Sequence, residues 1–132
     1  MFMRRLLSVL AAGLGFVCVA MSQEHTKDSL EQVKKALTDK KAVLIDVREK
    51  GEWDKGHLKD AKLLPLSTLQ GDTLPKDLAT LFPKDTIIYA HCAAGVRCVT
   101  AAGILRKAGY DVRAIKDGYK DLLQKGFPKA TD

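Results

Sequence analysis

The chain has 132 residues, and its 22 lysines and arginines outnumber its 16 aspartates and glutamates, giving a net charge of +6. This length favours a single domain, and the basic residues are spread along the chain without a run or interleaved aromatics, which argues against nucleic-acid binding. Of the three cysteines, Cys18 lies in the N-terminal apolar run, and the two others, Cys92 and Cys98, are too few for a disulfide scaffold. Their spacing lacks the companion ligands of a zinc site, so we expect no metal.

The first 20 residues have the pattern of a secretory signal peptide. Arg4 and Arg5 form a positive start, and an apolar run follows from Leu6 to Ala20. Small residues place the predicted cleavage after Ala20 or Ser22. The run is shorter than the roughly 20 apolar residues of a membrane-spanning helix. We therefore predict an exported protein, periplasmic in a Gram-negative source, without stable membrane insertion after processing. An uncleaved N-terminal anchor is the alternative.

The rest of the chain alternates predicted helices and strands. Asp28 is the expected cap of the first helix, with Glu31 at capping-box spacing. The predicted helices span residues 28–37, 52–56, 75–81, 98–108 and 119–125, and the predicted strands span 42–45, 62–66, 86–90 and 112–115. Continuous apolar runs are typical of strands buried on both faces of a parallel sheet. This order predicts an α/β fold whose mostly parallel central sheet has four to five strands, with helices on both faces.

Three polar or reactive residues lie at the carboxyl ends of the predicted strands. Asp46 and Arg48 follow one strand, and Cys92 follows another. Because ligands of open α/β sheets bind beyond the carboxyl ends of the strands, these residues are candidates for one site. We expect Asp46 and Arg48 to form an ion pair that supports the strand ends.

The most informative segment is the loop between a predicted strand and the helix that follows it. The loop residues are Cys92, Ala93, Ala94, Gly95, Val96 and Arg97. A loop this short can turn its backbone N–H groups toward the Cys92 sulfur, and the helix N-terminus adds partial positive charge. Such a site stabilises a thiolate and binds an anion beside it, which predicts a cysteine nucleophile. A buried, inert cysteine is the alternative.

Two neighbours of the nucleophile allow more than one interpretation. Arg97 is a cation at the positive end of a helix, which makes sense if it holds the loop or an incoming anion. Cys98 is either a small residue packed in the first helical turn or a resolving thiol, which would form a disulfide with Cys92 or take sulfur from it.

Three motifs in a fixed order resemble the single-domain rhodaneses, a sulfurtransferase family. They are residues 45–61 (Ile-Asp-Val-Arg-Glu, then Trp53, Gly-His-Leu and Ala61), the cysteine loop 92–97, and residues 105–119. The resemblance covers residues 29–128 and implies a rhodanese-like domain there. One departure is Cys98, because serine or threonine is usual at that position.

The resemblance implies a chemistry. Cys92 would accept the outer sulfur of a small anionic donor such as thiosulfate and pass it, as a persulfide, to cyanide or a thiol. The loop 92–97 would bind the sulfur, and no metal or organic cofactor would be needed. Four residues separate Cys92 from Arg97, fewer than in the related phosphatases, which suits sulfur better than phosphate. No feature of the sequence requires an oligomer, so we expect a monomer. A Cys92–Cys98 redox protein and a non-catalytic binding module are the alternatives.

Overall fold

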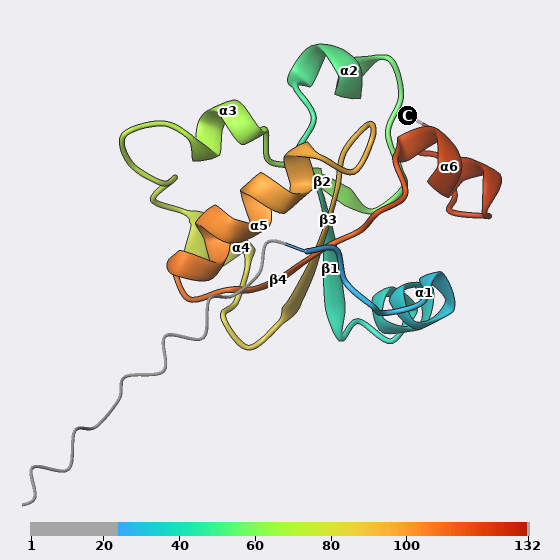
Figure 1. Cartoon of the computed structure of the whole chain (residues 1–132), viewed down its shortest axis with the longest axis horizontal. Coiled ribbons are helices and arrows are strands. Elements are labelled where there is room, and N and C mark those ends of the chain that lie inside the picture. The colour runs from blue at the N-terminus through green and yellow to red at the C-terminus, as the bar shows by residue number, and fades with distance from the viewer. Residues whose placement is uncertain (1–23, 132) are drawn as a thin grey trace, which may run out of the picture.

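Residues 24–131 are described by a computed structural model, and the predicted signal peptide lies outside these residues. Four parallel strands form one sheet in the order β2-β1-β3-β4 (Figure 1). The strands are β1 (Ala42–Asp46), β2 (Ala61–Leu63), β3 (Ile87–His91) and β4 (Asp111–Ala114). The helices are α1 (Leu30–Thr38), α2 (Lys50–Asp54), α3 (Leu66–Leu69), α4 (Leu78–Leu81), α5 (Arg97–Lys107) and α6 (Tyr119–Gln124). The predicted α/β fold is confirmed.

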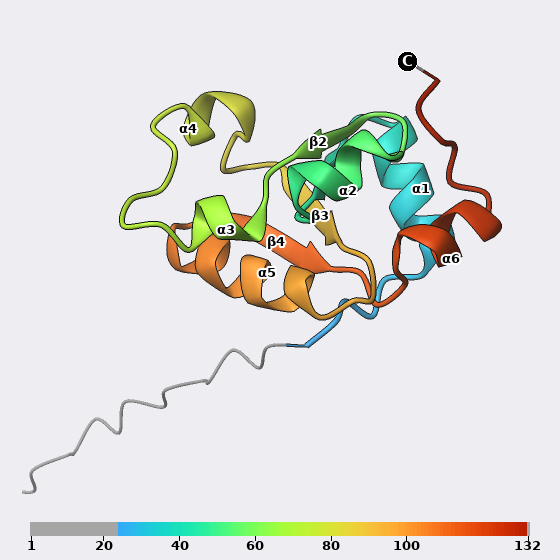
Figure 2. The ribbon, with the colours of Figure 1, turned by 90° about the horizontal axis from the view of Figure 1, so that it is seen from above.

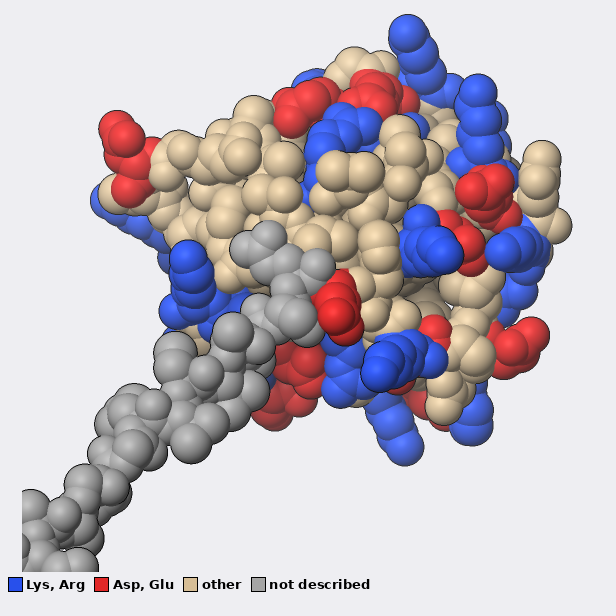
Figure 3. Space-filling model, in the orientation of Figure 1, with Lys and Arg blue, Asp and Glu red and all other residues tan. Residues whose placement is uncertain are grey.

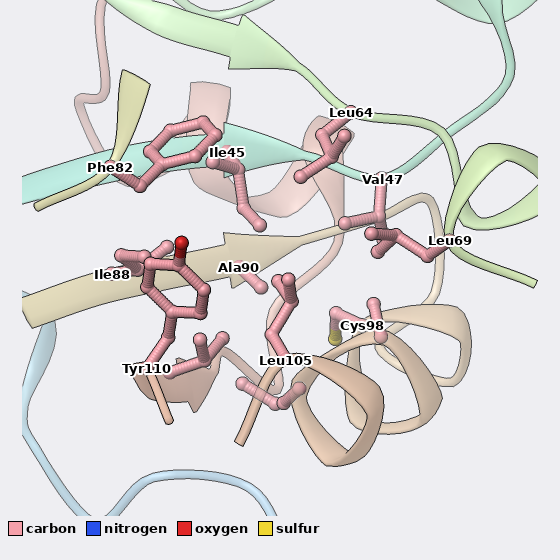
Figure 4. Packing of buried hydrophobic residues seen from close by; sticks show 14 of the residues in the cluster. Ile45, Val47, Leu64, Leu69, Phe82, Ile88, Ala90, Cys98, Leu105 and Tyr110 are labelled. Atoms are coloured by element: carbon pink, nitrogen blue, oxygen red, sulfur yellow. The ribbon is translucent and has the colours of Figure 1, made fainter. Parts of the chain in front are cut away.

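Helices cover both faces of the sheet, as Figure 2 shows from above, with α3, α4 and α5 on one face and α1 and α6 on the other. Each face has its own apolar cluster. One cluster includes Ile45, Ile88, Cys98, Leu105 and Tyr110 (Figure 4), and the other includes Val33, Leu44, Tyr89, Leu122 and Phe127. The central strands β1 and β3 contribute to both clusters because successive side chains point to opposite faces.

The predicted cap of the first helix is one residue too early. Ser29 caps α1, because its hydroxyl accepts a hydrogen bond from the Gln32 backbone N–H at 3.1 Å. The Gln32 side chain in turn accepts from the Ser29 N–H at 2.7 Å, which completes a capping box. Asp28 instead accepts hydrogen bonds from Tyr89 and Arg113, both at 2.8 Å. Asp28 with Glu31 and Ser29 with Gln32 both have capping-box spacing, and the tertiary contacts of Asp28 leave Ser29 as the cap.

Prolines mark two other boundaries that differ from prediction. The second strand ends at Leu63, and Pro65 precedes α3 instead of continuing that strand. The helix predicted from Pro75 begins only at Leu78. Proline fixes its own backbone angle and also restricts the residue before it, so both elements are shorter than their apolar pattern.

The ordered contacts extend beyond the predicted domain limits of 29 and 128. His25 forms a parallel bridge with Ala114 of β4, and near the other end the Ala130 N–H donates to the His57 carbonyl at 2.9 Å. The described fold therefore runs from the segment before α1 to the segment after α6. No helix between residues 24 and 131 is long and apolar enough to cross a membrane.

We predict that Leu105→Ala lowers the free energy of unfolding by about 2–5 kcal/mol, because Leu105 is 1% exposed in the core beneath α5. The matched control is Leu81→Ala, since Leu81 is 44% exposed and its truncation should change stability by about 0.5 kcal/mol or less. Urea denaturation of both variants measures the difference. Equal losses would contradict the assignment of the core.

Candidate active site

The cysteine loop lies where β3 meets α5, at the carboxyl edge of the sheet (Figure 1). Cys92 directly follows the last residue of β3, and Arg97 is the first residue of α5. The Cys92 side chain is buried, whereas Ala93 and Ala94 are exposed. The sulfur therefore lies at the base of a loop whose small residues leave its outer surface open.

Hydrogen bonds hold a negative charge on the Cys92 sulfur. The Gly95 backbone N–H donates to it at 3.1 Å. The pKa of Cys92 falls to about 5, because the Cys98 side chain donates a hydrogen bond and the backbone N–H groups of Cys98, Ala94 and Gly95 add to its effect. Burial alone would raise this pKa, so the donors outweigh desolvation. Cys92 is accordingly a thiolate at neutral pH, as a nucleophile requires.

Cys98 lies on the core side of the loop, among the apolar side chains between α5 and the sheet (Figure 4). The Cys98 thiol is 3.3 Å from the Ile115 carbonyl oxygen, and it can donate a hydrogen bond either to this oxygen or to the Cys92 sulfur. Since the single S–H proton can be donated to only one acceptor at a time, the charged Cys92 sulfur, as the stronger acceptor, is preferred. The Cys92 thiolate and burial hold the pKa of Cys98 far above its usual range. These features favour a hydrogen-bond donor over a resolving nucleophile.

Arg97 is bound by a carboxylate of α2. Its two terminal nitrogens donate to the two carboxylate oxygens of Glu52 at 2.6 and 2.9 Å, a paired geometry that arginine favours. The hydrogen bonds from Arg97 lower the pKa of Glu52 to about 2, so the pair stays charged above that pH. Figure 3 shows acidic and basic side chains side by side over α2. Arg97 therefore holds the loop against α2.

A buried ion pair lies at the end of β1, as the sequence predicts. The Arg48 side chain donates to both carboxylate oxygens of Asp46 at 2.8–3.0 Å, and to the Gly56 carbonyl at 2.8 Å. The exposed fractions of Asp46 and Arg48 are 0% and 4%. The Arg48 guanidinium also lies 4.2 Å from the centre of the Tyr119 ring. The pair therefore joins the end of β1 to the start of α6.

His91 precedes the nucleophile and is fully buried, but it makes no hydrogen bond through its ring within the described residues. Its Nε2 lies 3.7 Å from Asp46 Oδ2, beyond hydrogen-bond distance. Burial lowers the pKa of His91, so the ring is neutral at neutral pH. Its backbone carbonyl accepts from the Val47 N–H at 3.0 Å, which ties the end of β3 to β1.

The turn between β4 and α6 supports the loop from its other side. The Tyr119 N–H donates to the Cys92 carbonyl at 2.9 Å. A Cβ atom on Gly118 would overlap the Ala93 carbonyl, so only glycine allows this approach. The sequence shows Gly118 as a helix start and gives no sign of this contact.

The structure brings the predicted site residues together to different degrees. The loop and the first turn of α5 bring together Cys92, Gly95, Arg97 and Cys98. The Asp46–Arg48 pair lies at the end of the neighbouring strand β1. No spacing in the sequence reveals the role of Glu52, whose partner is 45 positions away, or of His25, which contacts Gly95. No group of three or more metal-ligating side chains lies together in residues 24–131.

The family model described as "Rhodanese-like domain" matches residues 29–125. The chain is 38% identical over 72 residues to the probable adenylyltransferase/sulfurtransferase MoeZ of Mycobacterium tuberculosis, covering 54% of this chain but only 17% of MoeZ. It is 35% identical over 98 residues to the uncharacterized protein YqhL of Bacillus subtilis, covering 68% of this chain and 73% of YqhL. The structure of the human single-domain sulfurtransferase TSTD1 matches with a TM-score of 0.64 at 26% identity, over 74% of this chain and 95% of TSTD1.

We predict that Cys92 reacts with iodoacetamide at a rate that rises with pH around a midpoint near 5, because only the thiolate attacks. Cys98→Ala removes the side-chain donor and should move this midpoint to higher pH, whereas Cys98→Ser keeps a donor and should stay near the parent value. Mass spectrometry of the alkylated chain measures the rates, with Cys92→Ser as the blank. An unchanged midpoint in Cys98→Ala would show that its thiol gives no support to the charge.

We also predict that Arg48→Met lowers the free energy of unfolding by about 3–5 kcal/mol at neutral pH, because it leaves the buried Asp46 carboxylate without its cation. Arg113→Met is the control, since that side chain is 34% exposed and its surface pairs contribute about 1 kcal/mol or less. Denaturation with urea at neutral pH tests both variants, and similar losses of stability would argue against the buried pair as a support.

Proposed function

The chain belongs to the rhodanese-like domain family, and on this premise we propose that it is a sulfurtransferase acting through a Cys92 persulfide. The proposed donor is thiosulfate or a similar small anion, and the proposed acceptor is cyanide or a thiol. The observation that carries the proposal is the geometry of Cys92, whose buried sulfur accepts a hydrogen bond from the Gly95 N–H at 3.1 Å in an environment that lowers its pKa to about 5. A low-pKa cysteine under a loop of small residues is a reactive site rather than a packing position.

In the first half-reaction the Cys92 thiolate attacks the outer sulfur of the donor. A new S–S bond forms to Cys92, the S–S bond of thiosulfate breaks, and sulfite leaves with the bonding electron pair. The product is a Cys92 persulfide with one negative charge on its terminal sulfur. Backbone N–H groups of the loop, such as that of Gly95, are the donors available to this charge.

In the second half-reaction the acceptor attacks the terminal sulfur of the persulfide. With cyanide the products are thiocyanate and the Cys92 thiolate, and with a thiolate acceptor they are a new persulfide and the Cys92 thiolate. No external oxidant or reductant enters either step. The two steps share one covalent intermediate, so ping-pong kinetics are expected.

A Cys92–Cys98 disulfide cycle receives less support from the geometry. Such a cycle needs Cys98 as a thiolate, but the neighbouring charge and burial raise its pKa and favour the thiol. Cys92 and Cys98 are not joined by a disulfide in the structure. A binding module without catalysis would have no need of a cysteine pKa this low.

We also propose that the protein works outside the cytosol after removal of its first 20 or 22 residues, on the basis of the signal-like pattern in the sequence. The mass of the protein recovered from an expressing Gram-negative cell, measured separately in the periplasmic and cytosolic fractions, tests this. A full-length cytosolic product would argue against export.

We predict that the mature protein, reduced and then incubated with thiosulfate, gains the mass of one sulfur atom, and that cyanide removes it and releases thiocyanate. Intact-mass spectrometry measures the gain, and Cys92→Ser is the control that should show none. Cys98→Ser should still gain the sulfur, because Cys92 alone carries it. If no donor of sulfane sulfur adds mass, and oxidation gives instead a Cys92–Cys98 disulfide by peptide mapping, the redox alternative would replace this proposal.

A further inference from the structure

A short segment ahead of the matched domain lies beside the active loop. The described chain begins at residue 24, and its blue start runs beside the end of β4 in Figures 1 and 2. His25 forms a parallel bridge with Ala114, and the Thr26 N–H donates to the Ala114 carbonyl at 2.7 Å. His25 and Thr26 thus pair with the end of β4 through an isolated bridge, although they precede the family match at residues 29–125.

The side chain of His25 reaches the cysteine loop. Its Nε2 atom lies 2.6 Å from the Gly95 carbonyl oxygen. A carbonyl oxygen only accepts hydrogen bonds, so Nε2 carries the proton and donates it. Gly95 is buried with a φ of +80°, and a Cβ there would overlap the Lys116 carbonyl and lie 3.3 Å from His25 Nε2. Gly95 therefore packs closely against both His25 and Lys116, which follows β4.

This contact holds the peptide group next to one whose N–H faces the sulfur. The peptide unit is planar and trans, so the Gly95 C=O and the Val96 N–H point in opposite directions. When His25 holds the carbonyl, the Val96 N–H is directed away from His25. The preceding peptide supplies the Gly95 N–H that donates to the Cys92 sulfur at 3.1 Å. The contact with His25 therefore fixes the peptide after the Gly95 Cα, and the hydrogen bond to the sulfur fixes the peptide before it.

We propose that His25 is a positioning residue of the Cys92 site, which acts by holding the Gly95 carbonyl so that the loop amides stay directed at the sulfur. The role deepens the proposed function, because the charge that the amides would hold during turnover is that of the Cys92 persulfide. His25 touches neither sulfur in this scheme. Its effect passes through the Gly95 peptide groups.

The test uses the mature chain and three variants. His25→Ala removes the donor, and His25→Gln keeps one, because the glutamine side-chain amide can place an N–H near the position of the imidazole Nε2–H. Lys27→Ala is the matched control, an exposed position in the same segment. The first readout is the pH dependence of Cys92 alkylation by iodoacetamide, and the second is the rate of sulfur gain from thiosulfate.

In His25→Ala we expect the alkylation midpoint to rise by up to about one pH unit, so that the rate below the midpoint falls about threefold to tenfold, the effect of one hydrogen bond. The rate well above the midpoint should not change, because Cys92 is then fully ionised in both proteins. His25→Gln should restore most of the parent profile, and Lys27→Ala should match it. The rate of sulfur gain should fall in His25→Ala and recover in His25→Gln.

Two results would overturn the proposal. One is a parent-like alkylation profile in His25→Ala. The other is a His25→Gln profile as weak as that of His25→Ala in a protein with an unchanged denaturation midpoint, since a donor would then be irrelevant. If the parent protein takes no sulfur from any sulfane donor, the proposed function fails, whereas the alkylation profiles still decide the role of His25.

Discussion

A negative charge on a nearly buried sulfur is the constraint on which the rest of the site depends. Burial opposes the charge, and the pKa of Cys92 falls to about 5 only because several donors converge on the sulfur. The donors come from one short loop and from the first turn of α5, so a small change in the loop conformation affects several of them together. The surrounding structure is therefore arranged to hold this loop in one conformation.

Four contacts from different elements hold the loop. Glu52 of α2 binds Arg97, the Tyr119 N–H binds the Cys92 carbonyl, Gly118 allows the close approach of Ala93, and His25 binds the Gly95 carbonyl. None of these partners lies within the loop itself. The buried Asp46–Arg48 pair supports the elements that carry these contacts, because it joins β1, the segment after α2 and the start of α6. Because apolar groups can often replace a buried ion pair without loss of stability, we infer that this pair matters mainly for the positions of the elements that it joins.

The sequence predicts the parts of the site that are local and misses those that are distant. A strand followed by Cys92, small residues and a helix is a continuous pattern, and Asp46 and Arg48 are two positions apart at a strand end. The Arg97–Glu52 pair spans 45 positions and the His25–Gly95 contact spans 70, so neither has a periodicity or a spacing to reveal it. The same distinction explains the cap of α1, where Asp28 is drawn away by Tyr89 and Arg113. Local chemistry defines candidates, and tertiary packing selects among them.

The pairing of Arg97 changes how an anion can be bound at this site. A free guanidinium above the loop would attract a doubly charged donor, but both terminal nitrogens of Arg97 are engaged by Glu52. Glu49 lies near enough to add further negative potential at Arg97. Attraction of an incoming anion then falls to the backbone N–H groups of the loop and the N-terminus of α5, which act only at short range. Such donors contribute little to long-range capture of a doubly charged anion. In the proposed reaction, these donors would therefore stabilise the charge of the persulfide intermediate more than they would attract thiosulfate from solution.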